Sequence, residues 1–331
     1  MLVATPATRR LLAVLAALGL AVLVGALVKL VQGWAPAAKF VEYAMPHADE
    51  APTAIAAAVD GTVWFTIDRA EAIGRWRDGR IDRLATPRRN FEPLGLAIAA
   101  DGSAWYTDIA AGAVVRMAPS GEAAPYTLNS PITRLGRLAV APDGSVWFAD
   151  ASGWGITQLA NGTFKQHASV AADDGPYGVA VSADGVVWAT LQRSGKLVRI
   201  NPDGTSASLD IPRRGAVPTD LALASDGSVW FLEFRANRLG HLKAGKFSEF
   251  EVGRENVGLS GLAVAADGAV WFGMVRTSSL GCLRNGKVAS IRLPRANARP
   301  YSVAVDPSGN VWYADLSGYI GMLPARYADL S

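Results

Sequence analysis

Carboxylates recur three residues after a repeated tryptophan, and this regular placement makes them the first candidates for chemistry. They are Asp108, Asp150, Glu233 and Asp315. Oxygen ligands of this kind suit Mg²⁺ or Ca²⁺, so acids gathered around one axis could hold a hard cation. The alternative is structural, since aspartates also cap turns and pair with arginines. The pattern leaves both interpretations open.

Arginines recur five residues after the same tryptophans, at Arg69, Arg193, Arg235 and Arg276. Three further candidates lie at the start of the strand that precedes a tryptophan: Arg137, Tyr177 and Tyr301. Guanidinium groups match carboxylates and phosphates. We therefore expect a mouth that attracts an anionic small molecule or an acidic protein surface. The alternative is a solvated loop face with local Asp–Arg pairs.

Composition narrows the chemistry further. The chain has 331 residues, one cysteine, three histidines and a formal net charge of +3. A single cysteine, Cys282, excludes an intrachain disulfide framework and a cysteine zinc cluster. The charge is too mild to indicate nucleic-acid binding, and no nucleic-acid motif, GxSxG, P-loop or HExxH sequence occurs. The composition is therefore that of an ordered, apolar-rich protein domain without a familiar catalytic motif.

A repeat supplies the elements that must position these residues. The motif Asp-Gly-x-Val-Trp-Phe and its variants place tryptophans at 64, 105, 147, 188, 230, 271 and 312, in steps of 41 or 42 residues. Alternating apolar residues such as Leu96-Ala97-Ile98-Ala99 precede each Asp-Gly pair and predict a strand. Four antiparallel strands per repeat predict an all-β, seven-bladed β-propeller. We expect it to be monomeric, with the seven repeat tryptophans in its core.

The two ends of the repeat array should join. The seventh copy lacks a fourth strand, and residues 39–45 resemble the fourth strands of other copies. We therefore expect residues 39–323 to form a ring that strand 39–45 closes, with residues 324–331 as a tail. Such pairing removes free sheet edges.

The N-terminus predicts a membrane segment. Residues 11–28 are an uninterrupted run of 18 apolar or glycine residues, and Leu30 and Val31 extend it. Arg9 and Arg10 precede the run, so residues 1–10 should be cytoplasmic, 11–31 transmembrane and 32–38 a linker. A cleavable signal sequence is the alternative. Either interpretation places the propeller on the extracytoplasmic, periplasmic side; the anchor makes it a single-pass protein of the cell membrane.

The repeat itself resembles a known family. A proline twelve residues before the tryptophan, then Gly-[Ile/Leu/Val]-Ala-Val, then Asp-Gly-x-Val-Trp-Phe, is similar to the virginiamycin B lyase (streptogramin lyase) family. More distantly, it resembles NHL-repeat and gluconolactonase-like propellers. The proline is present at 52, 93, 176, 218 and 300.

The resemblance implies a magnesium-dependent carbon–oxygen lyase that opens a cyclic depsipeptide at an ester. It implies metal-binding carboxylates before one such proline and three residues after the tryptophan of that blade, which here are Glu92 and Asp108. It also implies a histidine directly after the proline. No copy has one, because those positions hold Thr53, Leu94, Gly136, Tyr177, Thr219, Ser260 and Tyr301.

Two functions therefore compete. The first is a ligand- or partner-binding module with an Arg-rich mouth. The second is a metal-dependent lyase acting on a cyclic depsipeptide or lactone ester. Without the implied histidine a lyase needs another proton acceptor, so the sequence favours binding. His47 follows the closing strand and is the histidine that could reach the mouth.

Overall fold

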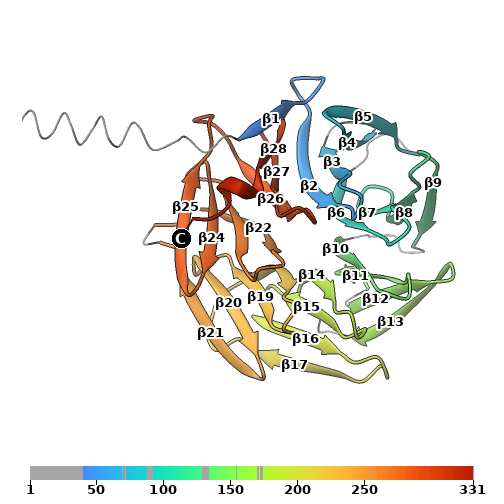
Figure 1. Cartoon of the computed structure of the whole chain (residues 1–331). Coiled ribbons are helices and arrows are strands. Elements are labelled where there is room, and N and C mark those ends of the chain that lie inside the picture. Colours follow the sequence, from blue (N-terminus) through green and yellow to red (C-terminus); the bar gives the residue numbers. More distant parts are fainter. Residues whose placement is uncertain are drawn as a thin grey trace, which may run out of the picture. The chain divides into compact units, whose positions relative to one another are not determined.

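The fold was obtained as a computed structural model. It describes residues 40–68, 70, 72–87, 92–128, 134–153, 155–169, 171, 174–253 and 255–330. These residues form seven four-stranded antiparallel sheets arranged as blades around a centre (Figure 1). The predicted seven-bladed propeller is confirmed. The predicted membrane segment, residues 11–31, lies outside the described residues. The described part contains no helix long and apolar enough to cross a membrane.

The blades follow one another along the chain, and each begins with its innermost strand. Blade 1 is β2 (Ala51–Ala57), β3 (Val63–Asp68), β4 (Ala72–Arg77) and β5 (Arg80–Ala85). Blade 2 is β6 (Pro93–Ile98), β7 (Ala104–Asp108), β8 (Ala113–Met117) and β9 (Ala123–Thr127). Blade 3 is β10 (Leu135–Val140), β11 (Val146–Asp150), β12 (Gly155–Ala160) and β13 (Thr163–Ser169). Blade 4 is β14 (Pro176–Val181), β15 (Val187–Leu191), β16 (Lys196–Ile200) and β17 (Ser206–Asp210).

The remaining blades repeat this order until the last. Blade 5 is β18 (Pro218–Leu223), β19 (Val229–Glu233), β20 (Arg238–Lys243) and β21 (Lys246–Glu251). Blade 6 is β22 (Leu259–Val264), β23 (Val270–Met274), β24 (Ser279–Arg284) and β25 (Lys287–Arg292). Blade 7 is β26 (Pro300–Val305), β27 (Val311–Asp315) and β28 (Tyr319–Leu323), together with β1 (Val41–Ala44).

Strand β1 completes blade 7 and joins the two ends of the ring. It pairs antiparallel with β28, from Val41 opposite Met322 to Ala44 opposite Tyr319, and the two strands lie side by side in Figure 1. After β28 the chain forms a short 3₁₀ helix, η1 (Ala325–Tyr327). Its first residue donates its N–H to Oδ1 of Asn310, so this part of the tail packs on blade 7.

The Asp-Gly pairs form the hairpins between the first and second strands. In the turn of blade 1, Oδ1 of Asp60 accepts the backbone N–H of Thr62 at 2.9 Å, and the hairpins of blades 2, 3, 5 and 6 repeat this bond. Gly61 and its counterparts have φ near +80°, a conformation that glycine adopts without strain. We call the end of the propeller with these turns the hairpin face, and the opposite end the mouth face.

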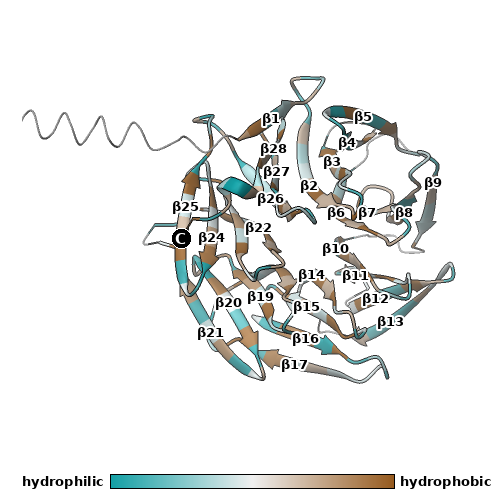
Figure 2. Cartoon of the chain, in the orientation of Figure 1, coloured by the Kyte–Doolittle hydropathy of each residue, from teal (hydrophilic) through white to brown (hydrophobic). Residues whose placement is uncertain are grey.

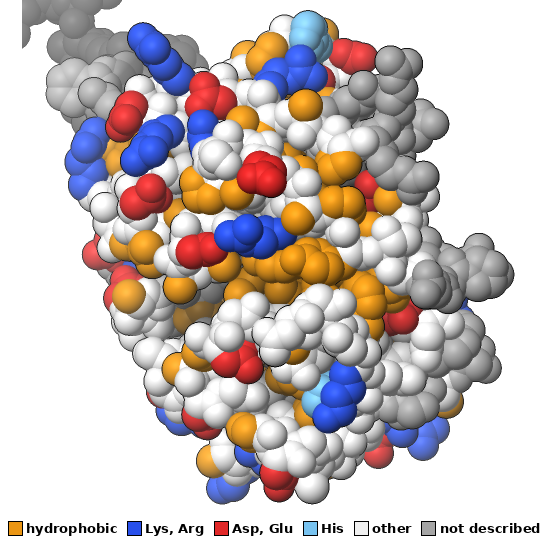
Figure 3. Space-filling model, turned by 90° about the vertical axis from the view of Figure 1, so that its right-hand side faces the viewer, with side chains coloured by type: hydrophobic (Ala, Val, Ile, Leu, Met, Phe, Trp, Pro, Cys, Tyr) orange, Lys and Arg blue, Asp and Glu red, His pale blue; other side chains and the backbone are white. Residues whose placement is uncertain are grey.

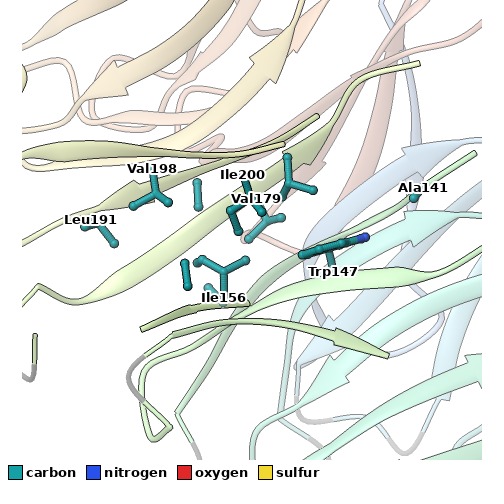
Figure 4. Packing of buried hydrophobic residues seen from close by; sticks show 11 residues of the cluster. Ala141, Trp147, Ile156, Val179, Leu191, Val198 and Ile200 are labelled. Carbon is teal, nitrogen blue, oxygen red and sulfur yellow. The ribbon is translucent and has the colours of Figure 1, made fainter. Parts of the chain in front are cut away.

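The core lies between neighbouring blades. Trp147 of blade 3 packs with Val179, Val198 and Ile200 of blade 4, and Figure 4 shows these side chains meeting between the two sheets. Trp64, Trp271 and Trp312 are 1 % exposed, as expected for core residues. Trp188 and Trp230 depart from that expectation, because both are only half-buried. The outer strands are less apolar, and hydrophilic and hydrophobic residues mix along β21 (Figure 2).

The outer rim of the propeller carries both hydrophobic and charged side chains. Figure 3 shows the side that carries the outer strands β5, β9 and β13, where hydrophobic side chains gather at the centre between charged ones. On blade 2, for example, Arg116 pairs with Asp101 at 2.7 Å. The aspartate of this Asp-Gly hairpin is therefore paired with an arginine of its own blade.

Candidate functional site

A β-bulge in each innermost strand positions the central side chains. The pairing with the second strand shifts register between Leu135 and Leu138 in β10, and between Pro218 and Leu221 in β18. Bulges re-aim side chains and are common beside functional sites. Neighbouring innermost strands approach closely here, since a Cβ added at Gly178 would lie 2.6 Å from the carbonyl oxygen of Thr219.

The bulges bring Arg137, Tyr177, Asp220 and Tyr301 together at the centre of the ring; we call these four residues the axial cluster. They line one cavity of about 100 Å³, together with Phe234 and other residues of blades 5 and 6. Nε of Arg137 lies 3.0 Å from Oδ1 of Asp220, and these two side chains are 13 % and 14 % exposed. The guanidinium also lies over the ring of Tyr177, 6.0 Å from its centroid.

Burial and the ion pair govern the electrostatics of the axial cluster. Burial raises the pKa of Asp220 above its usual value, and Arg137 and the N–H of Leu262 offset this only in part. Burial also lowers the pKa of Arg137, but Asp220 and the two tyrosines outweigh it and the net shift is upward. The pKa of Tyr177 is raised to about 12, chiefly by burial. Tyr177 is therefore a neutral hydrogen-bonding group at physiological pH.

Asp220 corrects one expectation from the sequence. Arg137 was predicted to be available to an anion, but its charge is already opposed by Asp220, which sequence analysis did not single out. A clue was present in the repeat. Arg137 and Asp220 stand at the position that holds Ala54, Gly95, Gly178, Gly261 or Ser302 in the other blades. Two opposite charges at a position of otherwise small residues could have suggested a pair.

The four mouth acids are not brought together. Oδ1 of Asp150 accepts the N–H groups of Ser152 at 2.9 Å and Gly153 at 2.8 Å. Oδ1 of Asp315 accepts the N–H groups of Arg299 and Ser317, each at 2.8 Å. Each of these two carboxylates thus caps loops of its own blade, as the structural alternative predicted. Within the described ranges, no three His, Cys, Asp or Glu side chains are grouped to hold a metal ion.

Glu233 differs from the aspartates. Its side chain is fully buried, and neither carboxylate oxygen has a hydrogen-bond partner among the described residues. Nε of Arg213 is 3.8 Å from Oε2. Burial, and then the nearby charge of Glu249, raise the pKa of Glu233 to about 7. Glu233 is thus a buried acid that titrates near neutral pH.

Glu92 and Asp108, the residues matching the implied metal ligands, do lie together. The N–H of Glu92 approaches Oδ1 of Asp108 at 3.5 Å, and the N–H of Ala111 donates to the same oxygen at 3.1 Å. Asp108 is 4 % exposed, whereas the Glu92 side chain is exposed. Oδ1 of Asp108 already has backbone donors, so these two residues do not form a complete metal site by themselves.

Several arginines of the mouth face are exposed. Arg235 and Arg276 each donate their backbone N–H to the loop that leads into the innermost strand of the same blade. Neither side chain forms an ion pair with any residue that the structure describes, and the same holds for Arg134, Arg214 and Arg299. Arg193 is also exposed, and Arg69 lies outside the described residues. His47 is exposed in the loop after β1.

Comparisons with known proteins agree with the fold. Residues 31–168 and 89–326 match the virginiamycin B lyase family. A virginiamycin B lyase from Nocardia farcinica (strain IFM 10152) is 33% identical over 194 residues, which are 59% of this chain and 67% of that protein. A streptogramin B lyase structure superposes with a TM-score of 0.82 at 24% identity, covering 86% of this chain and 96% of the other.

A second solved structure is similarly close. A catalytically inactive virginiamycin B lyase variant from Staphylococcus aureus, with quinupristin, superposes with a TM-score of 0.81 at 24% identity. The superposition covers 86% of this chain and 99% of the other. At this level of identity the likeness shows the shared propeller fold.

Proposed function

The chain belongs to the virginiamycin B lyase family, and from this premise we propose that it is a membrane-anchored, extracytoplasmic module that binds an anionic small molecule or an acidic protein surface at its mouth face. The observation that carries this proposal is the set of exposed arginines, Arg235 and Arg276 among them, that form no ion pair with the described residues. Guanidinium groups left without internal partners are available to carboxylates or phosphates.

The axial cluster shapes the floor of this proposed site. Arg137 and Asp220 together add little net charge, and Tyr177 and Tyr301 present hydroxyl groups and ring surface. The positive character of the mouth therefore comes from the exposed loop arginines rather than from the centre. A ligand with an acidic periphery fits this arrangement better than one with a single buried anion.

Binding of an acidic probe tests the proposal. We expect a fluorescently labelled octaglutamate peptide to bind the full chain, with affinity that falls as salt rises, because exposed charges are screened over about 8 Å at physiological ionic strength. The double variant Arg235→Ala/Arg276→Ala should bind at least about tenfold more weakly. The matched control is Arg80→Ala/Arg292→Ala, which removes two exposed arginines from outer strands. Equal affinity of the two double variants in fluorescence anisotropy would refute the proposal.

The alternative function is a lyase that opens a cyclic depsipeptide or lactone ester with the help of Mg²⁺ or Ca²⁺. Family membership and the adjacency of Glu92 and Asp108 favour it. In this alternative the two carboxylates would hold the cation, and the cation would supply Lewis-acid polarisation of the ester. Turnover of a streptogramin-type ester should then stop with chelator, and Glu92→Gln or Asp108→Asn should each abolish it. Ring opening that survives both substitutions contradicts this assignment.

The membrane anchor has its own test. The apolar run with Arg9 and Arg10 before it supports a segment that spans the bilayer with its N-terminus inside. Protease added to spheroplasts should digest the propeller if it lies outside the cytoplasm. Complete protection from the protease, with digestion after lysis, reverses the orientation.

A further inference from the structure

Blades 4 and 5 are neighbours in the ring (Figure 1). A hollow opens between them on the hairpin face. Its volume is about 330 Å³, within the range of small-molecule sites. Trp188 of blade 4 and Leu223, Val229 and Leu242 of blade 5 form its apolar wall. Asp184 and Arg199 stand among the same lining residues. This hollow is separate from the mouth face and from the arginines considered there.

The fourth strand of blade 4 presents no aromatic ring to Trp188. In blades 2, 5 and 7, an aromatic ring from the fourth strand packs against the repeat tryptophan: Tyr126 on Trp105, Phe250 on Trp230 and Tyr43 on Trp312. The corresponding residue of blade 4 is Leu209, which lies opposite Leu197 as Tyr126 lies opposite Val114. The neighbouring turn of blade 5, Ala244–Gly245, carries no larger side chain that could fill the gap.

The charged residues of blade 4 are also held apart. In blade 2, Arg116 and Asp101 form an ion pair at 2.7 Å, closing the blade over its own turn. Arg199 and Asp184 are the matching residues of blade 4, since each arginine lies opposite the repeat tryptophan. They form no ion pair within 4 Å in the described structure, and Asp184 instead accepts a hydrogen bond from the hydroxyl of Ser182. Blade 2 has Ala99 at the position of Ser182 and cannot make that bond.

We propose that this hollow is a binding site for a zwitterionic amino acid with an aromatic side chain. The ligand carboxylate pairs with Arg199, its ammonium group pairs with Asp184, and its ring packs against Trp188 and the apolar wall from blade 5. A separated positive and negative charge beside an apolar wall complements a molecule that carries both charges and an apolar body. The guanidinium of Arg199, whose Cζ is 6.0 Å from the centroid of Trp188, stands at the edge of that wall.

Calorimetric titration with L-phenylalanine tests the site in the full chain. One equivalent should bind, whereas phenylacetate, phenethylamine and glycine, which each lack one of the three features, should bind at least about tenfold more weakly. Arg199→Ala and Asp184→Ala remove exposed side chains and should each weaken L-phenylalanine binding by about tenfold or more. The matched control Arg116→Ala in blade 2 should leave the affinity unchanged.

A second variant tests the role of Ser182. Ser182→Ala gives blade 4 the alanine of blade 2, so Asp184 is released to pair with Arg199 and binding should weaken. Absence of L-phenylalanine binding at millimolar concentration overturns the proposal. So does binding that Arg199→Ala and Asp184→Ala leave unchanged, or binding of phenylacetate or phenethylamine that is as tight as that of L-phenylalanine. None of these results bears on the mouth face, because its arginines are intact in every variant.

Discussion

At the end of the second strand, aspartate and glutamate side chains play different roles, although they differ in length by only one methylene group. Asp150 and Asp315 reach the backbone N–H groups of the loops beside them and cap those loops. Glu233 stands at the same position with a longer side chain, and its carboxylate has no hydrogen bond within the described structure. Blades 1, 4 and 6 have Ile67, Leu191 and Met274 there instead. This position thus accepts an apolar side chain, whereas a buried carboxylate without hydrogen bonds destabilises the fold.

Replacing Glu233 should stabilise the propeller above neutral pH. The pKa of Glu233 is raised from 4.5 to about 7, so the fold favours the protonated acid and ionisation destabilises it. This penalty is absent below about pH 4.5, grows between pH 4.5 and 7, and is constant above pH 7. We expect Glu233→Met, which copies blade 6, to gain about 2–3 kcal/mol over the natural chain at pH 8 and far less at pH 4.5.

Urea unfolding at these two pH values measures the effect. The control is Glu255→Met, which alters an exposed glutamate in a loop near the mouth face and should change neither stability nor its pH dependence. A stability difference between Glu233→Met and the natural chain that is the same at both pH values would contradict the assigned titration.

In blades 1, 5, 6 and 7, an aromatic residue in the second strand lies opposite a glycine in the third. Phe231 in β19 lies opposite Gly240 in β20, and a Cβ added at Gly240 would lie 2.1 Å from the phenyl ring. Phe65 with Gly74 and Phe272 with Gly281 repeat the arrangement. Blade 4 inverts the sizes, with Ala189 in the second strand opposite Val198 in the third. Blades 2 and 3 keep the aromatic ring opposite a larger residue, Val115 or Thr157, so the glycine is needed only where the ring lies directly over the third strand.

This pairing predicts a compensating double variant. Gly240→Ala should destabilise the chain by about 1–3 kcal/mol, because the ring of Phe231 must move. Phe231→Ala should cost about 3–5 kcal/mol by leaving a cavity. The double variant Phe231→Ala/Gly240→Val copies blade 4 and should recover part of the Phe231→Ala loss. Chemical denaturation of the variants measures this coupling, and a double variant less stable than Phe231→Ala alone would show that the two positions do not share one volume.

At the scale of the strand, the sequence predicts the regular features and misses the irregular ones. Alternation and Asp-Gly pairs suffice for the strands and hairpins, because these depend on neighbours in the chain. The bulges that start each innermost strand interrupt that alternation. They turn Arg137 and Asp220 toward each other although 83 positions separate them, so the ion pair depends on the geometry of the whole ring.

At the scale of the molecule, seven tryptophans at near-identical spacings predict seven blades, because each repeat buries its apolar face only against its neighbours. Departures from the repeat are harder to interpret in advance. Trp188 keeps the motif, yet it is half-buried and lines the hollow between blades 4 and 5. Whether a conserved position is covered thus depends on residues outside the motif.

The ring is closed by more than the backbone of β1. Glu42 in this strand accepts two hydrogen bonds from Arg295, each at 3.1 Å, and one from the hydroxyl of Tyr313 at 2.7 Å. Arg295 also pairs with the fully buried Asp315 and lies 3.6 Å from the ring centroid of Tyr319. The side chains of Glu42 and Arg295 are 14 % and 20 % exposed. One carboxylate therefore connects the first strand of the propeller to Arg295, in the loop between blades 6 and 7, and to Tyr313 of blade 7.

Removing that carboxylate should weaken the closure of the whole ring. We expect Glu42→Ala to lower the free energy of unfolding by about 2–3 kcal/mol, because hydrogen bonds to charged groups are lost and Tyr313 is left buried without its acceptor. The control is Glu251→Ala, which removes a more exposed outer-strand acid that pairs with Arg238 at 3.1 Å and should cost less than about 1 kcal/mol. Thermal unfolding compares the two variants. Equal losses would mean that closure depends on the strand pairing of β1 with β28 and not on the contacts of Glu42.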